Sequence, residues 1–142
     1  MKNLTSSVYD FEKLRKGDFL YVDKTEYIWK LIEAPGESYF LSRPRRFGKS
    51  LTLSTLKAVF QGKKELFQGL AIYDKPYDWK QYPVIHLDLG DCEPNGLQDL
   101  SDKLKYKLDV IASSYGIQLQ GGSPDIQFSD LILKLSKLDD SE

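Results

Sequence analysis

The sequence predicts an α/β fold, in which a mostly parallel sheet is covered by helices on both faces to give three layers, α/β/α. Two short apolar runs, residues 39–41 and 84–89, have the aromatic and aliphatic composition of buried strands. The segments that follow these runs carry apolar residues at helical spacing. Strands that alternate with helices favour a parallel sheet, and such sheets bind their ligands at the carboxyl ends of the strands.

The N-terminal part of the chain, residues 1–36, is expected to form helical and extended pieces. Asp10 and Gly17 bound a short helix, because one is a good N-cap and the other a helix stop. Asp23 then caps a second helix, which stops near residues 35–36 at a Pro-Gly pair. The apolar face of this second helix is expected to consist of Tyr27, Ile28, Leu31 and Ile32.

Residues 37–142 are expected to form the core of the domain. A helix follows the first apolar run and reaches Gln61, and the aromatic residues after it are expected to fold back onto the core. Two further helices are expected over about residues 97–115 and 126–138, separated by the Gly-Gly-Ser-Pro breaker at 121–124. The expected apolar face of the first of these three helices is Leu53, Leu56, Val59 and Phe60.

The segment between the first apolar run and its helix has the composition of a phosphate-binding loop. In such a loop backbone N–H groups wrap the β-phosphate, a lysine reaches the β- and γ-phosphates, and a serine hydroxyl binds Mg²⁺. Gly48, Lys49 and Ser50 are the residue types that these roles need. The usual pattern has a glycine six positions before the lysine, where this chain has Arg43. The alternative is a basic surface turn in which Ser50 only caps the helix.

ATP and Mg²⁺ are therefore the predicted ligands, with Ser50 as the metal ligand through ATP. Lys49 is also the predicted catalytic residue, because its charge can stabilise the phosphoryl group in the transition state. The residues expected to bind the nucleotide are Arg43, Pro44, Arg45, Arg46, Phe47, Gly48, Lys49, Ser50 and Leu51.

Asp88 ends the second apolar run and has two interpretations. It can support Mg²⁺ as an acidic residue at a strand end, or it can cap a turn. The next residue, Leu89, favours the turn, since ATPases that activate a water generally place a glutamate there. Asp23 likewise either starts a helix or borders a base-binding pocket, where Tyr21 or Tyr27 would stack on adenine.

The cations of the chain are concentrated locally. The formal net charge is −1, so the whole domain has no field that would attract nucleic acid. Arg43, Arg45, Arg46 and Lys49 nevertheless fall within seven positions. A strand that leads into a helix N-terminus favours a triphosphate as their partner, because it adds backbone donors and a dipole. The alternative is a nucleic-acid or protein interaction module that uses the three arginines without nucleotide hydrolysis.

Three motifs resemble the predicted AAA-ATPase-like family of bacterial proteins. The stretch FLSRPRRFGKSLTLSTL, residues 40–56, resembles the family's phosphate-loop signature, in which arginine also replaces the first glycine. Residues 21–25, YVDKT, and residues 82–85, YPVI, resemble the motifs before and after it. The resemblance covers nearly the whole chain and weakens after about Asp99.

The resemblance implies a P-loop NTPase-like domain of which residues 1–142 are the N-terminal part. In the family the strand with the acidic Asp-Glu motif comes later, so the fold is expected to be incomplete at its C-terminus. ATPase activity is then expected of the full-length protein, and weak or absent activity of this fragment. The family's proteins usually continue with a nuclease domain of the PD-(D/E)xK type, which this chain lacks.

The remaining features indicate a cytoplasmic protein. The single cysteine, Cys92, cannot form an intramolecular disulfide and fits a reducing compartment. The chain has no apolar run long enough to span a bilayer, and its start lacks the apolar core of a signal peptide. No membrane partner is expected.

Overall fold

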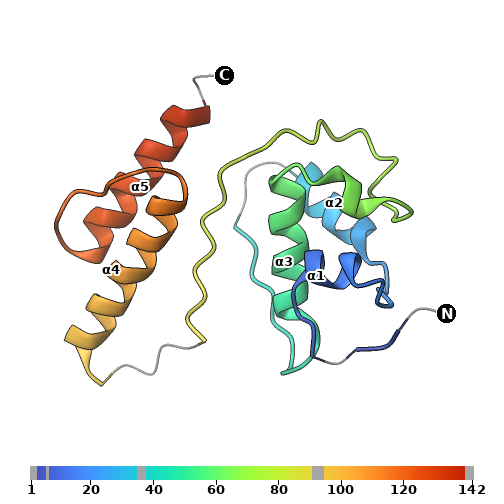
Figure 1. Cartoon of the computed structure of the whole chain (residues 1–142), viewed down its shortest axis with the longest axis horizontal. Coiled ribbons are helices and arrows are strands. Elements are labelled where there is room, and N and C mark those ends of the chain that lie inside the picture. The colour runs from blue at the N-terminus through green and yellow to red at the C-terminus, as the bar shows by residue number, and fades with distance from the viewer. Residues whose placement is uncertain (1–2, 6, 35–37, 91–94, 140–142) are drawn as a thin grey trace. The chain divides into compact units, whose positions relative to one another are not determined.

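The computed structural model describes residues 3–5, 7–34, 38–90 and 95–139. The chain forms two compact units, Met1–Tyr82 and Pro83–Glu142, which are drawn in Figure 1. The predicted helix stop at residues 35–36 and Cys92 lie outside the described residues. Whether residues 1–142 are part of a larger ATPase domain stays a prediction.

The first unit contains three α-helices, α1 (Phe11–Lys16), α2 (Thr25–Glu33) and α3 (Lys49–Phe60), and the short 3-10 helix η1 (Lys64–Phe67). The Asp10 carboxylate accepts a hydrogen bond of 2.8 Å from the backbone N–H of Lys13, so it caps α1 as its sequence position predicts. The structure therefore confirms the helices expected at these places.

The core of the first unit is rich in aromatic side chains. The ring of Phe67 lies 4.7 Å from that of Phe11 and 5.1 Å from that of Trp79, centroid to centroid. The expectation that the aromatic residues after α3 fold back onto the core is thus confirmed. Tyr27, by contrast, is exposed on α2 and does not belong to its buried face. The buried residues of this core are Phe11, Ile28, Ala58, Val59, Leu66, Phe67, Leu70 and Ile72.

The second unit is an extended segment followed by two contacting helices, α4 (Leu97–Ser114) and α5 (Pro124–Asp139) (Figure 1). Its buried residues lie at helical spacing, Leu108 and Ala112 on α4, Leu131 and Leu135 on α5. Within the described ranges no helix is long and apolar enough to cross a membrane.

The predicted three-layer fold with a mostly parallel sheet is wrong for this structure. The residues that the structure describes contain helices but no strand, and their only β-pairing is an isolated bridge between Asn3 and Phe19. Both predicted strands, residues 39–41 and 84–89, are present as unpaired chain. A strand needs the backbone of a neighbouring strand for its hydrogen bonds, and here neither segment pairs with one.

The two segments use their apolar residues differently. Ile85 and Leu87 alternate along the chain and pack against the helical core of the second unit. The backbone of Val84 forms its hydrogen bonds with a side chain and not with a neighbouring strand. Its N–H donates to Tyr115 Oη at 2.8 Å, and its carbonyl accepts from that hydroxyl at 3.2 Å. Residues 39–41 have exposed side chains and no such packing.

Candidate functional site

Residues 43–48 form a turn that leads directly into α3. Gly48, the residue before the helix, has φ 75° and ψ 19°, a left-handed conformation that glycine adopts without strain. Arg46 also has a positive φ, 65°, which costs a side-chain-bearing residue roughly 1–2 kcal/mol. The two left-handed residues bend the chain sharply just before the helix begins.

The N-terminus of α3 has free hydrogen-bond donors. Among the residues that the structure describes, no side chain caps this helix end. The N–H groups of Lys49, Ser50 and Leu51 belong to its first turn, where a helix provides no backbone acceptor. These donors, together with the positive end of the helix dipole, suit an anion.

Lys49 bends back over the turn. Its Nζ donates to the carbonyl oxygen of Arg43 and, at 3.0 Å, to that of Pro44. The side chain thereby spans the turn from the first residue of α3 to the beginning of the loop. An anion bound at the helix end would meet an ammonium group that is already held beside the loop, and it would compete with two carbonyls for it.

Two further residues hold the base of the turn. Leu51 packs against the core of the first unit, so the side chain of this predicted nucleotide-binding residue anchors the helix. Thr52 binds the carbonyl of Gly48 twice, through its N–H and its hydroxyl, each at 2.9 Å. Ser50 lies in the same helical turn and is exposed, so its hydroxyl is accessible.

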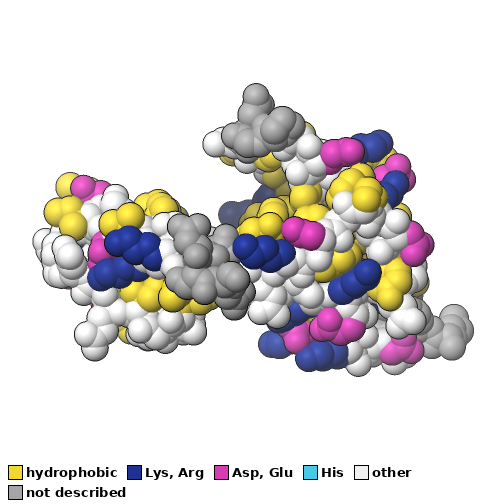
Figure 2. Space-filling model, turned by 90° about the horizontal axis from the view of Figure 1, so that it is seen from above, with side chains coloured by type: hydrophobic (Ala, Val, Ile, Leu, Met, Phe, Trp, Pro, Cys, Tyr) yellow, Lys and Arg dark blue, Asp and Glu magenta, His cyan; other side chains and the backbone are white. Residues whose placement is uncertain are grey.

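The arginines of the loop give it an uncompensated positive charge. Arg43, Arg45 and Arg46 are exposed, and none of them forms an ion pair with a described residue. Several lysines elsewhere do pair with acids, among them Lys16 and Lys63 with Glu12. Figure 2 shows one face of the molecule, on which basic, acidic and apolar side chains are interspersed.

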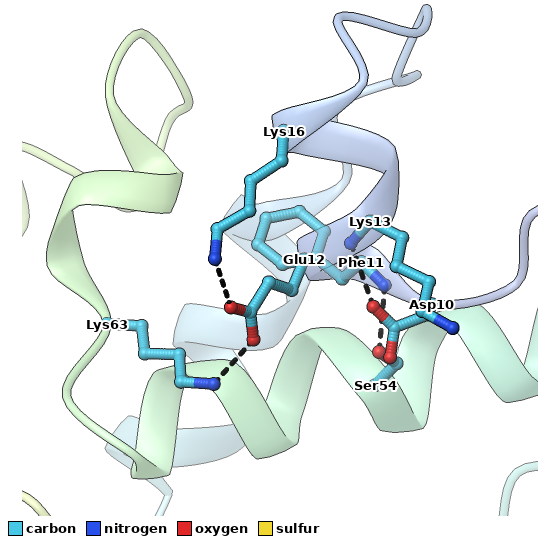
Figure 3. A network of polar contacts seen from close by, with 7 residues as sticks. All are labelled: Asp10, Phe11, Glu12, Lys13, Lys16, Ser54 and Lys63. Atoms are coloured by element: carbon cyan, nitrogen blue, oxygen red, sulfur yellow. Dashed lines mark hydrogen bonds and ion pairs between the residues drawn. The ribbon is translucent and has the colours of Figure 1, made fainter.

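Helix α1 braces α3 from the side, as Figure 3 shows. The backbone N–H of Phe11 donates to Ser54 Oγ at 2.8 Å, one turn along α3 from Ser50. Glu12 bonds Lys16 at 2.7 Å and also Lys63, just beyond α3. The bond from Lys16, followed by that from Lys63, lowers the pKa of Glu12 to about 2. The sequence analysis missed Ser54, because a lone serine within α3 gives no signal of the distant backbone N–H from which it accepts a hydrogen bond.

Asp23 and Thr25 tie α2 to the chain after η1. Asp23 Oδ1 accepts from the N–H of Thr25 at 2.8 Å, and its Oδ2 accepts from the N–H of Ala71 at 2.7 Å. The buried Thr25 hydroxyl accepts from Ile72 N–H at 3.1 Å. Burial raises the pKa of Asp23, but the hydrogen bonds from Thr25 and Ala71 bring it below its usual value. These contacts favour the structural interpretation of Asp23.

The tyrosines considered for adenine stacking differ in exposure. The ring of Tyr21 packs edge-on against Phe11, with centroids 5.2 Å apart, and burial raises the pKa of its hydroxyl. Tyr21 is thus partly buried and packs against the core of the first unit. The ring of Tyr27 is exposed, and Lys30 Nζ lies 5.7 Å from its centroid.

Asp88 belongs to the second unit, whereas the loop belongs to the first. Its Oδ1 accepts from the N–H of Gly90 at 2.8 Å, so the turn-capping contact is the one observed. The described part of the chain holds no group of three His, Cys, Asp or Glu residues that would bind a metal ion. A role of Asp88 beside Mg²⁺ stays a prediction.

Comparisons with known proteins give one family. Residues 6–141 match the model of a family described as predicted AAA-ATPase. A relative from Azotobacter chroococcum mcd 1, described as "Uncharacterized protein in vnfD 5'region", is 41% identical over 133 residues, 92% of this chain. The chain spans only 25% of the length of that relative. No solved structure matches the chain.

Proposed function

Because this chain belongs to the predicted AAA-ATPase family, we propose that it binds ATP with Mg²⁺ through residues 43–51. The observation that carries the proposal is the uncapped N-terminus of α3, with Lys49 in its first turn and the Lys49 ammonium held over the preceding loop. Backbone donors, a helix dipole and a lysine in this arrangement are what a phosphate group needs.

Each residue has a separate role in this proposal. The N–H groups of the first turn bind a phosphate, Lys49 leaves the carbonyls of Arg43 and Pro44 for the β- and γ-phosphates, and the Ser50 hydroxyl binds Mg²⁺. Arg45 and Arg46 add positive charge at the exposed side of the loop. The metal, when bound with ATP, neutralises charge on the phosphates.

Isothermal calorimetry with ATP and Mg²⁺ tests this proposal on wild type and Lys49→Ala. The mutation should weaken binding by roughly tenfold or more, because a charge-assisted hydrogen bond contributes about 1.5–3 kcal/mol. Lys57→Ala, on the same helix but two turns away from the loop, is the matched control and should bind like wild type. Equal affinities of wild type and a folded Lys49→Ala variant would exclude the phosphate-loop assignment.

Ser50→Ala tests the metal ligand separately. The variant should bind ATP in excess chelator like wild type but gain less affinity when Mg²⁺ is added, since only the proposed metal contact is lost. An unchanged Mg²⁺ dependence would remove Ser50 from the site and leave the phosphate contacts in place.

We propose hydrolysis of ATP for the whole protein. The relative from Azotobacter chroococcum mcd 1 is about four times as long as the region that matches this chain, since that region makes up 25% of it. For the 142-residue chain we expect phosphate release near the background rate. Phosphoryl transfer needs a positioned metal and an oriented water as well as a phosphate cradle. Rapid hydrolysis by this chain that Asp88→Asn abolishes would instead give Asp88 the catalytic role.

A further inference from the structure

The first backbone hydrogen bond of α3 ends on the carbonyl of Gly48. The N–H of Thr52 donates to this oxygen at 2.9 Å, as the first bond of a helix does. The hydroxyl of Thr52 donates to the same oxygen, also at 2.9 Å. The carbonyl therefore has two donors from one residue, and this residue lies outside residues 43–51, which the proposed ATP site uses.

The orientation of this carbonyl also sets the orientation of a phosphate donor. The carbonyl of Gly48 and the N–H of Lys49 belong to one peptide group, which is planar and trans, so they point in opposite directions. Lys49 is the first residue of α3, and its N–H has no acceptor within the helix. A contact that fixes the Gly48 carbonyl thus aims the Lys49 N–H away from the helix, toward a phosphate bound there.

Gly48 does not fix this peptide group by itself. Its φ of 75° and ψ of 19° are left-handed, and the lack of a Cβ leaves glycine many other conformations of similar energy. A Cβ built at Gly48 would meet no heavy atom of the described residues within 4 Å, so packing does not confine its backbone either. The two bonds from Thr52 are then the contacts that hold the peptide group.

We propose that Thr52 is a positioning residue of the phosphate site. Its hydroxyl holds the peptide group between Gly48 and Lys49 so that the Lys49 N–H donates to phosphate. The inference rests on the proposed binding of ATP by residues 43–51. Thr52 acts through this N–H and not through contact with the ligand. A second donor on the carbonyl also polarises the peptide group, which makes its N–H a stronger donor.

Thr55 provides a comparison within the same helix, because it makes the same kind of bond. Its hydroxyl donates to the carbonyl of Leu51 at 2.8 Å, again four positions earlier. The N–H of the peptide group between Leu51 and Thr52 is already bonded to Gly48, so this group offers no donor to a ligand. Thr55 is fully buried, and loss of its hydroxyl should affect the fold but not the phosphate donors.

Calorimetry tests the proposal on Thr52→Val, which keeps the shape of the side chain and removes the hydroxyl. Its affinity for ATP with Mg²⁺ should fall roughly 2- to 12-fold, the effect of one hydrogen bond. Inorganic tripolyphosphate, which has no base or sugar, should lose affinity by the same factor. Thr52→Ser keeps the hydroxyl and should bind like wild type. Thr55→Val is the matched control, and it should unfold at lower urea but keep the wild-type affinity.

A measurement without any ligand tests the position of the peptide group directly. The ¹⁵N order parameter of the Lys49 amide should be near about 0.85, the value of rigid backbone, in wild type and Thr52→Ser. It should be lower in Thr52→Val and unchanged in Thr55→Val.

Three results would overturn the proposal: a wild-type affinity of Thr52→Val, an equal loss of affinity in folded Thr55→Val, or an unchanged order parameter in Thr52→Val. Failure of the proposed function looks different, because wild type would then bind neither ATP nor tripolyphosphate. In that case the order parameter alone decides whether Thr52 holds the peptide group.

Discussion

The two units of the chain differ in where their buried residues come from. In the first unit, Phe11 of α1 packs with Val59 of α3 and Phe67 of η1, which lie about fifty positions later in the sequence. In the second, the buried residues come from two consecutive helices, with Ile85 and Leu87 packed against them. The first unit also contains long-range polar contacts. Arg15 donates hydrogen bonds to the carbonyls of Leu66 and Gln68, each at 2.7 Å and about fifty positions away in the sequence.

The comparison shows why the candidate site lies on the first unit. Helix α3 supplies Ala58 and Val59 to the core and Ser54 to α1, so the helix end that carries Lys49 is held from several sides. A binding loop attached to a helix that is supported in this way is held in a more precise geometry. The second unit, with fewer buried residues, offers less support.

The largest loss of stability is expected for a substitution in the core of the first unit. Phe67→Ala removes a fully buried ring and should lower the free energy of unfolding by about 3–5 kcal/mol. Both tryptophans, Trp29 and Trp79, pack on this core, so their fluorescence reports its unfolding in urea. Phe40→Ala, at an exposed ring, should change stability by less than about 0.5 kcal/mol. A similar loss for both variants would contradict the assigned core.

Leu131→Ala makes the corresponding change in the second unit. Leu131 is fully buried between α4 and α5, and its loss should be near the lower end of roughly 2–5 kcal/mol, because a small core collapses more easily around the cavity. The helical circular dichroism should fall at lower urea while tryptophan fluorescence keeps its midpoint. Leu133→Ala, on an exposed part of α5, is the control. A shift of both signals together would show that the two units unfold as one.

Tyr115→Phe tests how residues 84–89, which were expected to form a strand, are held in the second unit. The variant keeps the ring and removes the hydroxyl that binds Val84 N–H and C=O, which should cost about 1 kcal/mol. Hydrogen exchange at the Val84 amide should become faster. Tyr106→Phe, on α4, whose C-cap is Tyr115, should leave that rate unchanged. Equal exchange in wild type and Tyr115→Phe would mean that the hydroxyl does not protect this amide.

The smallest effect concerns the ion pairs of Glu12. Its pKa is lowered to about 2 by Lys16 and then Lys63, so the pairs stabilise the fold above the ordinary pKa of 4.5 and lose this effect as the pH falls toward 2. Glu12→Gln should therefore be less stable than wild type at pH 7, by under about 1 kcal/mol because the groups are partly exposed. The difference should shrink at pH 3 and in high salt. Thermal unfolding at both pH values measures it, and a constant difference would argue against the ion pairs.

The helices were predictable because their signals are local. Asp10 and Gly17 bound α1 as expected, and the apolar spacing located α4 and α5 within a few residues of their observed ends. Helix α5 begins earlier than expected, at Pro124, since proline suits the first helical position. Helix hydrogen bonds join residues four apart, so a short stretch of sequence contains most of the information.

The strands were not predictable because their bonds depend on partners elsewhere. Residues 39–41 and 84–89 have the composition of strands, but composition says nothing about which backbone lies beside them. In the structure, a tyrosine hydroxyl satisfies Val84 and no described segment pairs with residues 39–41. The same limit explains why the contact between Ser54 and α1 was missed.

By itself the sequence determined the helices, the residue types of the loop from Arg43 to Ser50, and membership of the family that matches residues 6–141. Only the tertiary structure decided that the apolar runs remain unpaired, that Lys49 turns back onto the loop carbonyls, and that Phe40 stays in water. The first set depends on neighbours along the chain. The second depends on which distant groups come within hydrogen-bonding or packing distance, and spacing in the sequence does not encode that.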